Sequence, residues 1–207
     1  MTRMFVLFAA AAAAIFGLAA GWAWFMGAEG GDRFADCRQS VAATGAATIG
    51  GPFTLTSDSG ARVTDADVIT GPTLVYFGYT FCPDFCPTDL SRNAVAADIL
   101  AERGVDLGQV FVSIDPERDT PEAMADFTTS IHPDLLGLTG SPEEVKAAAD
   151  AYRVYFRKAG DDPEYYMMDH STFTYLMAPE FGFLEFFGSD VGAEDLADRV
   201  ACFAGKL

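Results

Sequence analysis

The spacing of apolar and polar residues along the chain predicts strands that alternate with helices. Two short apolar runs, Thr73–Phe77 and Gln109–Ile114, have the length and composition of buried strands. A helical spacing of apolar residues follows each run, over 88–103 and from Pro121 to about Ile131. A strand followed by a helix, twice in succession, is typical of an α/β domain.

The second half of the chain carries clear boundary signals. Ser141, Pro142 and Glu144 form a capping box with proline at the first helical position, and we expect that helix to run to about Phe156. The other expected elements are hairpin strands at 53–56 and 61–64, a strand at 135–138, an irregular segment at 161–168, a hairpin at 171–178 and 183–187, and a closing helix at 192–204.

The N-terminal part is different in kind. Phe5–Met26 is apolar and uncharged, long enough to cross a bilayer as a helix. Trp22 and Trp24 lie near its far end, where aromatic belts occur, and Arg3 places the N-terminus in the cytoplasm. A cleaved signal peptide is the alternative, although the apolar run is long for one. Either way, the rest of the chain reaches a compartment where disulfides persist.

Composition and charge narrow the function classes. The chain has 207 residues, half of them hydrophobic, which suits one domain plus an appendage. We expect a membrane anchor over 1–27, a Gly- and Ala-rich linker over 28–50 and a domain over 51–207. The net charge of −17 is spread along the sequence and argues against binding nucleic acid through a basic surface.

The turn between the first strong strand and its helix carries two cysteines, Cys82 and Cys86. Unpaired backbone N–H groups and the helix dipole at that position favour the thiolate, which is the form that reacts or binds metal. A spacing of four allows both sulfurs to share a face, suited to Cu(I), to zinc or to a disulfide. One buried structural cysteine beside one incidental cysteine is the alternative, but the flanking Pro83 and Pro87 favour an exposed turn.

The order of elements is that of a thioredoxin-like domain, with a central mixed sheet, flanking helices and an N-terminal β-hairpin. In that fold the loop before the late hairpin lies beside the cysteine turn, and here it holds Asp169 and His170. We therefore expect His170 to join the two sulfurs in a site for Cu(I) that also admits Cu(II), with Asp169 orienting the imidazole. A histidine satisfied within a turn is the alternative, and it is the interpretation that we give His132.

Three sequence blocks carry a family resemblance. Thr80–Pro87, Val112–Pro121 and Tyr166–Ser171 resemble the signatures of the Sco/SenC family, in the right order, and the similarity extends from about Gly50 to the C-terminus. Members of that family are membrane-tethered copper proteins that help to assemble cytochrome c oxidase. The resemblance implies that Cys82, Cys86 and His170 bind copper.

The resemblance also implies partners and a location. It predicts a copper metallochaperone that matures the dinuclear CuA centre of oxidase subunit II and receives its metal from an upstream copper donor. The protein would be a single-pass protein of the bacterial inner membrane with its domain in the periplasm, or would lie on the equivalent intermembrane-space face of mitochondria. Asp115 and Asp119 recur in the family motif, and turn and cap chemistry explains them. For Met167 and Met168 we expect apolar packing.

Two enzymatic functions compete with this interpretation. Cys82 and Cys86 can act as the redox pair of a thiol–disulfide oxidoreductase that reduces the CuA cysteines or other exported thiols, and such a reductase does not need His170. Peroxidases of the peroxiredoxin type place proline and Ser or Thr at fixed positions before their cysteine. Neither Cys82 nor Cys86 has both of those residues at those positions.

Two further cysteines lie outside these motifs. Cys37 falls in the linker and Cys202 in the last helix. We expect them to form a structural disulfide that attaches the linker to the domain, with two unpaired thiols as the alternative.

Overall fold

The computed structural model describes residues 17, 22, 32–39, 49–160, 162 and 165–207. The chain divides into two units, Met1–Asp36 and Cys37–Leu207, and the folded domain is the second. Within the described residues, no helix combines the length and the apolar character needed to cross a membrane. The helix expected over 5–26 lies almost wholly outside those residues, as does part of the expected linker.

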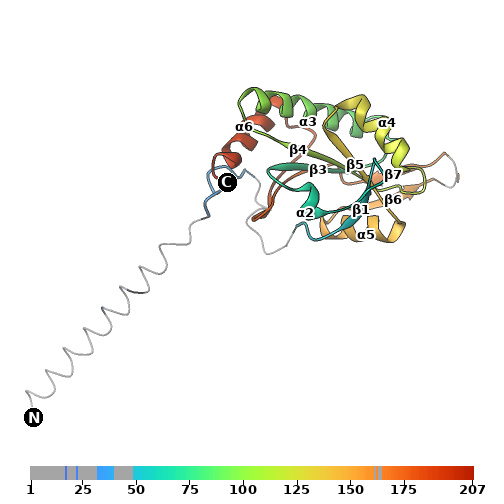
Figure 1. Ribbon diagram of the computed structural model, residues 1–207, viewed down its shortest axis with the longest axis horizontal. Coiled ribbons are helices and arrows are strands. Elements are labelled where there is room, and N and C mark those ends of the chain that lie inside the picture. The colour runs from blue at the N-terminus through green and yellow to red at the C-terminus, as the bar shows by residue number, and fades with distance from the viewer. Residues whose placement is uncertain (1–16, 18–21, 23–31, 40–48, 161, 163–164) are drawn as a thin grey trace, which may run out of the picture. The chain divides into compact units, whose positions relative to one another are not determined.

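One mixed sheet forms the centre of the domain (Figure 1). Strands β3, β4 and β5 run parallel in its middle, and antiparallel hairpins extend it on both sides. The predicted α/β fold, with a central mixed sheet and an N-terminal hairpin, is confirmed. In spatial order the strands are β2 (Arg62–Thr64), β1 (Thr54–Ser57), β5 (Leu135–Thr139), β4 (Gly108–Ser113), β3 (Thr73–Gly78), β8 (Thr174–Ala178) and β9 (Gly182–Phe187).

Helices cover both faces of this sheet. Figure 1 shows α3 (Phe85–Glu102), α4 (Pro121–Ile131) and α6 (Ala193–Ala204) on one face and α5 (Pro142–Ala151) on the other. The predicted capping box at the start of α5 is present, because the Ser141 hydroxyl accepts a hydrogen bond from the Glu144 N–H. A short helix that we did not predict, α2 (Asp65–Val68), leads into β3.

Strand β3 is the most deeply buried part of the sheet. All six of its residues are buried, as expected for a central strand with helices on both faces. Tyr76 and Phe77 point to opposite faces: Tyr76 stacks on Phe111, and Phe77 packs against Tyr152 and Tyr175. The cysteine turn therefore starts from a strand end that is fixed by aromatic packing on both sides.

A separate two-stranded sheet includes the end of the segment that we predicted to be irregular, at Met167 and Met168. Strand β6 (Phe156–Ala159) pairs antiparallel with β7 (Met167–His170). The expected helix to about residue 156 is wrong, because Arg153 has a φ of 58° and a left-handed residue ends a helix. The sequences Phe-Arg-Lys-Ala and Met-Met-Asp-His do not alternate regularly between apolar and polar residues, so the period-2 signal of a strand was missing.

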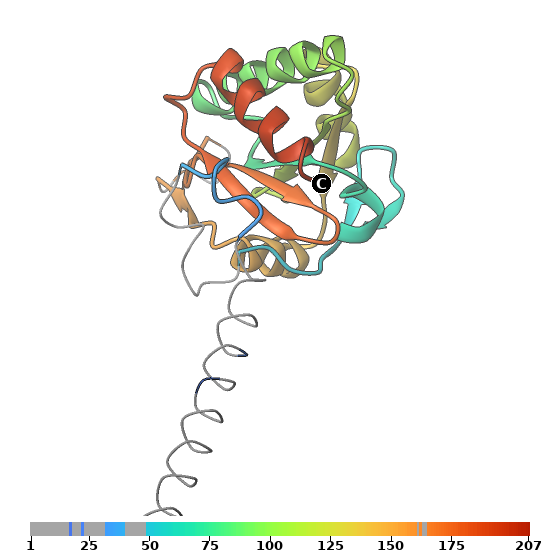
Figure 2. The same ribbon diagram turned by 90° about the vertical axis from the view of Figure 1, so that its left-hand side faces the viewer.

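The linker is attached to the domain by a disulfide between Cys37 and Cys202 of α6. Two hydrogen bonds extend the attachment, since the Arg38 Nε–H donates to the Leu184 carbonyl and the Gln39 N–H to the Glu185 carboxylate. Figure 2 shows this segment beside the β8–β9 hairpin. Residues 37–39 therefore bind the domain well before residue 51, where we expected it to begin.

We predict that the double variant Cys37→Ser/Cys202→Ser is less stable than the native protein by about 2–4 kcal/mol. The cross-link closes a sequence separation of 165 residues, and its loss frees the unfolded chain. Urea unfolding of the oxidised native protein and of the variant measures the difference. A reductant should lower the native midpoint to that of the variant and leave the variant unchanged; equal midpoints without reductant would contradict a stabilising role.

Candidate metal centre

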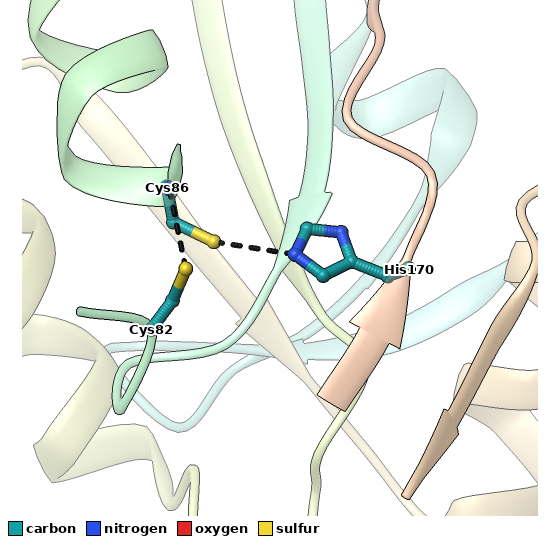
Figure 3. A group of neighbouring side chains, drawn as sticks. All are labelled: Cys82, Cys86 and His170. Carbon is teal, nitrogen blue, oxygen red and sulfur yellow. Dashed lines mark hydrogen bonds between the residues drawn. The ribbon is translucent and has the colours of Figure 1, made fainter. Parts of the chain in front are cut away.

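Two buried cysteines lie where β3 is followed by α3 (Figure 3). Helix α3 begins at Phe85 rather than at Thr88, so Cys86 lies in its first turn and Cys82 precedes the N-cap residue Asp84. The Cys86 N–H points at the Cys82 sulfur at 3.3 Å. An N–H group at the helix N-terminus, which has no partner inside the helix, thus donates a hydrogen bond to a cysteine sulfur, as the sequence predicted.

The two thiols differ in acidity. The pKa of Cys82 is lowered to about 4 because the Cys86 side chain donates a hydrogen bond to its sulfur, and the backbone N–H groups of Cys86 and Asp84 act in the same direction. The same interaction, followed by burial, raises the pKa of Cys86. Near neutral pH the pair therefore carries one thiolate, on Cys82, and one thiol, on Cys86.

Gly78 makes room for the second sulfur. A Cβ atom at this position would lie 2.6 Å from the Cys86 Sγ and 3.0 Å from the Phe111 ring. The last residue of β3 must therefore lack a side chain for Cys86 to occupy its place over the strand end.

His170 is the last residue of β7, and its ring points toward the sulfurs (Figure 3). Its Nε2 lies 3.7 Å from the Cys86 Sγ, and its Nδ1 lies 2.8 Å from the Ser171 carbonyl oxygen. Since a carbonyl only accepts, Nδ1 carries the proton and Nε2 keeps a lone pair facing the cysteines. The Tyr79 ring meets the imidazole edge-on, with 5.8 Å between ring centroids, and limits its rotation.

The group that orients this imidazole is not the one that we expected. Asp169 was predicted to do so, but its carboxylate binds the Arg157 guanidinium at 2.9 Å. Neighbouring residues of a strand point to opposite sides, so Asp169 on β7 faces away from the side that His170 presents to the cysteines. The Ser171 carbonyl takes the predicted role of Asp169 as the partner of Nδ1.

The three side chains form a donor set that suits one soft metal ion. The sulfurs of Cys82 and Cys86 and a ring nitrogen of His170 all lie within 4.8 Å of one another. Donors that bind one ion at about 2.0–2.3 Å lie at most about 4.6 Å apart, so a small contraction would complete the site. Two thiolates and an imidazole favour copper or zinc over magnesium or calcium. A hollow of about 460 Å³ leads to this set.

Side chains of the turn between β4 and α4 hold the cysteine turn in place. Asp119 is fully buried and accepts hydrogen bonds from the Thr80 N–H, the Thr80 hydroxyl and the Ser113 hydroxyl. Burial raises its pKa above the usual range. Of the turn and cap chemistry expected for this aspartate, the turn is present, because the Asp119 N–H donates to the Asp115 carbonyl, but the N-cap of α4 is Thr120.

Of the remaining candidates, His132 lies apart from the donor set, whereas Met167 and Met168 line the hollow beside it. His132 contacts Gln109, Asp98 and the Asp134 N–H, which fits the structural role that we expected. Met168 is buried in the core as predicted, whereas Met167 is 46% exposed, and its sulfur lies 3.9 Å from the Tyr79 hydroxyl.

The chain is similar to proteins whose family is known. A family model described as SCO1/SenC matches residues 41–205. Protein SenC of Rhodobacter capsulatus is 53% identical over 178 residues, which are 85% of this chain and 79% of that protein. The mitochondrial SCO1 homolog of Homo sapiens is 42% identical over 156 residues, which are 74% of this chain and 52% of that protein.

Solved structures of Sco proteins are also similar to this chain. The copper-bound ScoI of Arabidopsis thaliana gives a TM-score of 0.71 at 45% identity, covering 75% of this chain and 98% of that one. Yeast Sco1 gives 0.73 at 34% identity, covering 78% of this chain and all of that one. The matched region contains the cysteine turn and the strand that ends in His170, and the resemblance drawn from three motifs is confirmed. The chain belongs to the SCO1/SenC family.

Proposed function

We propose that this protein binds copper as cargo through Cys82, Cys86 and His170 and acts in the assembly of cytochrome c oxidase. The observation that carries the proposal is the meeting of three soft donor atoms within 4.8 Å from two segments far apart in sequence. Relatives support it, since ScoI of Arabidopsis thaliana and ScoI of Bradyrhizobium japonicum have been solved with copper bound.

The three proposed ligands differ in whether they must lose a proton before they bind the metal. Cys82 offers a thiolate at neutral pH because its pKa is about 4. Cys86, whose pKa is raised, must give up its proton when it binds, so binding releases acid. In the neutral tautomer with its proton on Nδ1, His170 offers the lone pair of Nε2 to the metal. The open hollow gives a partner's sulfur access to the metal, so that it can replace one ligand at a time. Copper can then pass to the partner without being released into water as a free ion.

The proposed partner and location are those that membership of the family suggests. We propose that the recipient is the CuA domain of oxidase subunit II and that an upstream copper donor loads the site. Relatives include a bacterial SenC and mitochondrial SCO1 proteins, which supports a periplasmic or intermembrane-space domain. We further propose that an N-terminal helix over 1–27 anchors the domain in the membrane through the linker.

A second candidate, a thiol–disulfide reductase, is favoured by the unequal acidity of the thiols. The Cys82 thiolate would attack a substrate disulfide, forming a mixed disulfide and releasing one substrate thiolate. Cys86 would then lose its proton and attack the Cys82 sulfur, which leaves a Cys82–Cys86 disulfide and frees the second substrate sulfur. An external dithiol would have to reduce the pair again.

We predict that His170→Ala lowers Cu(II) affinity by more than about 100-fold, since loss of a supporting group alone costs a metal site about 10–100-fold. Cu(I) affinity should fall much less, because two thiolates suffice for Cu(I). Competition with chelators for each oxidation state measures both values, and His132→Ala is the matched control. Native-like Cu(II) affinity in His170→Ala would overturn the three-ligand site. Oxidase assembly that is fully rescued by this variant would favour the reductase.

We predict that iodoacetamide modifies Cys82 of the reduced, metal-free protein at a rate that hardly changes between pH 6 and 8. With a pKa of about 4, Cys82 is already a thiolate throughout that range. An ordinary thiol with a pKa near 8.5 would react roughly tenfold more slowly for each unit by which pH falls. Peptide mapping by mass spectrometry separates Cys82 from Cys86. A tenfold rise in the Cys82 rate per pH unit would contradict the assigned thiolate.

A further inference from the structure

Arg118 lies between the two segments that carry the donor atoms. It belongs to the turn between β4 and α4, and its side chain is only 14% exposed. Its Nε donates to the Asp115 carboxylate at 2.5 Å, and its Nη1 donates to the Tyr166 carbonyl at 3.0 Å. Tyr166 directly precedes β7, so one of these bonds ends on the segment that carries His170.

The same guanidinium also contacts the cysteine turn. Its central carbon lies 3.7 Å from the Tyr166 ring centre, 4.7 Å from that of Phe81 and 5.8 Å from that of Tyr79. Phe81 directly precedes Cys82 in the sequence. Arg118 therefore stacks on aromatic rings from both ligand-bearing segments.

Its charge is compensated within this cluster. The Asp115 carboxylate is 1% exposed and also accepts a hydrogen bond from the Tyr166 hydroxyl at 2.7 Å. The Arg118 Nη2 is buried and has no hydrogen-bond acceptor among the described residues. The guanidinium as a whole lies over aromatic rings, a contact that its planar shape suits better than a compact ammonium would.

Two contacts of side chains from the β6–β7 sheet fix its direction less firmly. Lys158 of β6 pairs with Glu117, but the two side chains are 45% and 60% exposed, and such surface pairs contribute little. Met168 of β7 is buried, but apolar burial is non-directional. Strands β6 and β7 form a sheet of their own, without ladder bonds to the central one. Two directional contacts besides those of Arg118 hold the segment: the Tyr166 hydroxyl donates to the Asp115 carboxylate, and the Met168 backbone bonds to the Tyr79 hydroxyl. Arg118 contacts Asp115, Tyr166 and Tyr79, and so lies against the partners of both.

We propose that Arg118 is a positioning residue: it holds the Tyr166–His170 segment against the cysteine turn and so sets the contribution of the imidazole to copper binding. This inference rests on the proposed copper function. Arg118 does not touch the metal. It acts through the Tyr166 carbonyl and the paired aromatic rings.

The experiment compares Arg118→Lys with Arg103→Lys in the full chain. Lysine at 118 keeps a cation beside the buried Asp115 carboxylate, which protects the fold, but it loses the planar stack and the fixed pair of donors. Arg103 forms an exposed ion pair with Asp198, between α3 and α6, and serves as the matched control.

Hydrogen exchange of the metal-free protein is the first measurement. In Arg118→Lys we expect exchange of the 166–170 amides to speed up about tenfold while the central sheet keeps its protection. Competition with chelators is the second measurement. Cu(II) affinity should fall about 10-fold, within the range for groups that support a ligand, while Cu(I) affinity stays within about threefold because the thiols remain in place. Arg103→Lys should change none of these values.

Each other outcome overturns the proposal. Unchanged exchange at 166–170, or unchanged Cu(II) affinity, would show that Arg118 does not position the imidazole. A parallel loss of Cu(I) and Cu(II) affinity, with faster exchange throughout the domain, would show a general role in stability. If the native protein bound no copper, the proposed function would fail, and exchange at 166–170 would still decide whether Arg118 holds the segment.

Discussion

The approach of the His170 imidazole to the sulfurs of Cys82 and Cys86 is the contact on which the site depends. Cys86 and His170 are separated by 84 residues, so the chain brings them together only when the whole domain has folded. The cysteine turn is fixed at one end by β3, whose aromatic side chains pack on both faces of the sheet. The histidine comes from a small sheet beside the central one. The site is therefore assembled by contacts between these two parts, not by either part alone.

The hydrogen bond between the two sulfurs, reinforced by their burial, explains their unequal acidity. Two neighbouring sulfurs shielded from water cannot both carry a negative charge at low cost, so one remains a thiol that donates to the other. Helix α3 directs backbone N–H groups at Cys82, which decides which of the two ionises. A metal ion removes this conflict, because its positive charge takes the place of the shared proton. The metal-free pair is thus chemically prepared both for a soft cation and for attack on a disulfide.

The sequence predicted the parts of the site that have local signals. The strand, turn and helix around Cys82 and Cys86 follow from an apolar run and a helical pattern, and the order of elements placed His170 beside them. The β6–β7 sheet was not predicted, because its residues lack a period-2 alternation and the end of α5 depends on a left-handed Arg153.

The supporting contacts were missed for a different physical reason. Asp115 and Asp119 look like ordinary turn residues in the sequence, and one side-chain partner of each, Tyr166 and Thr80 respectively, lies far along the chain. Only the folded backbone determines which distant groups a buried carboxylate meets. Asp169 is the converse case: it is next to His170 in the sequence, but the alternation of a strand turns it away.

The bond between the His170 Nδ1 and the Ser171 carbonyl has an evolutionary consequence. A carboxylate that orients a histidine can be lost in a single codon change, but a peptide carbonyl is present whatever residue stands at 171. The path of the main chain, and not the side chain at 171, therefore determines the tautomer of this imidazole. Drift at position 171 can change what surrounds the ring, while the lone pair continues to face the sulfurs as long as the backbone keeps its course.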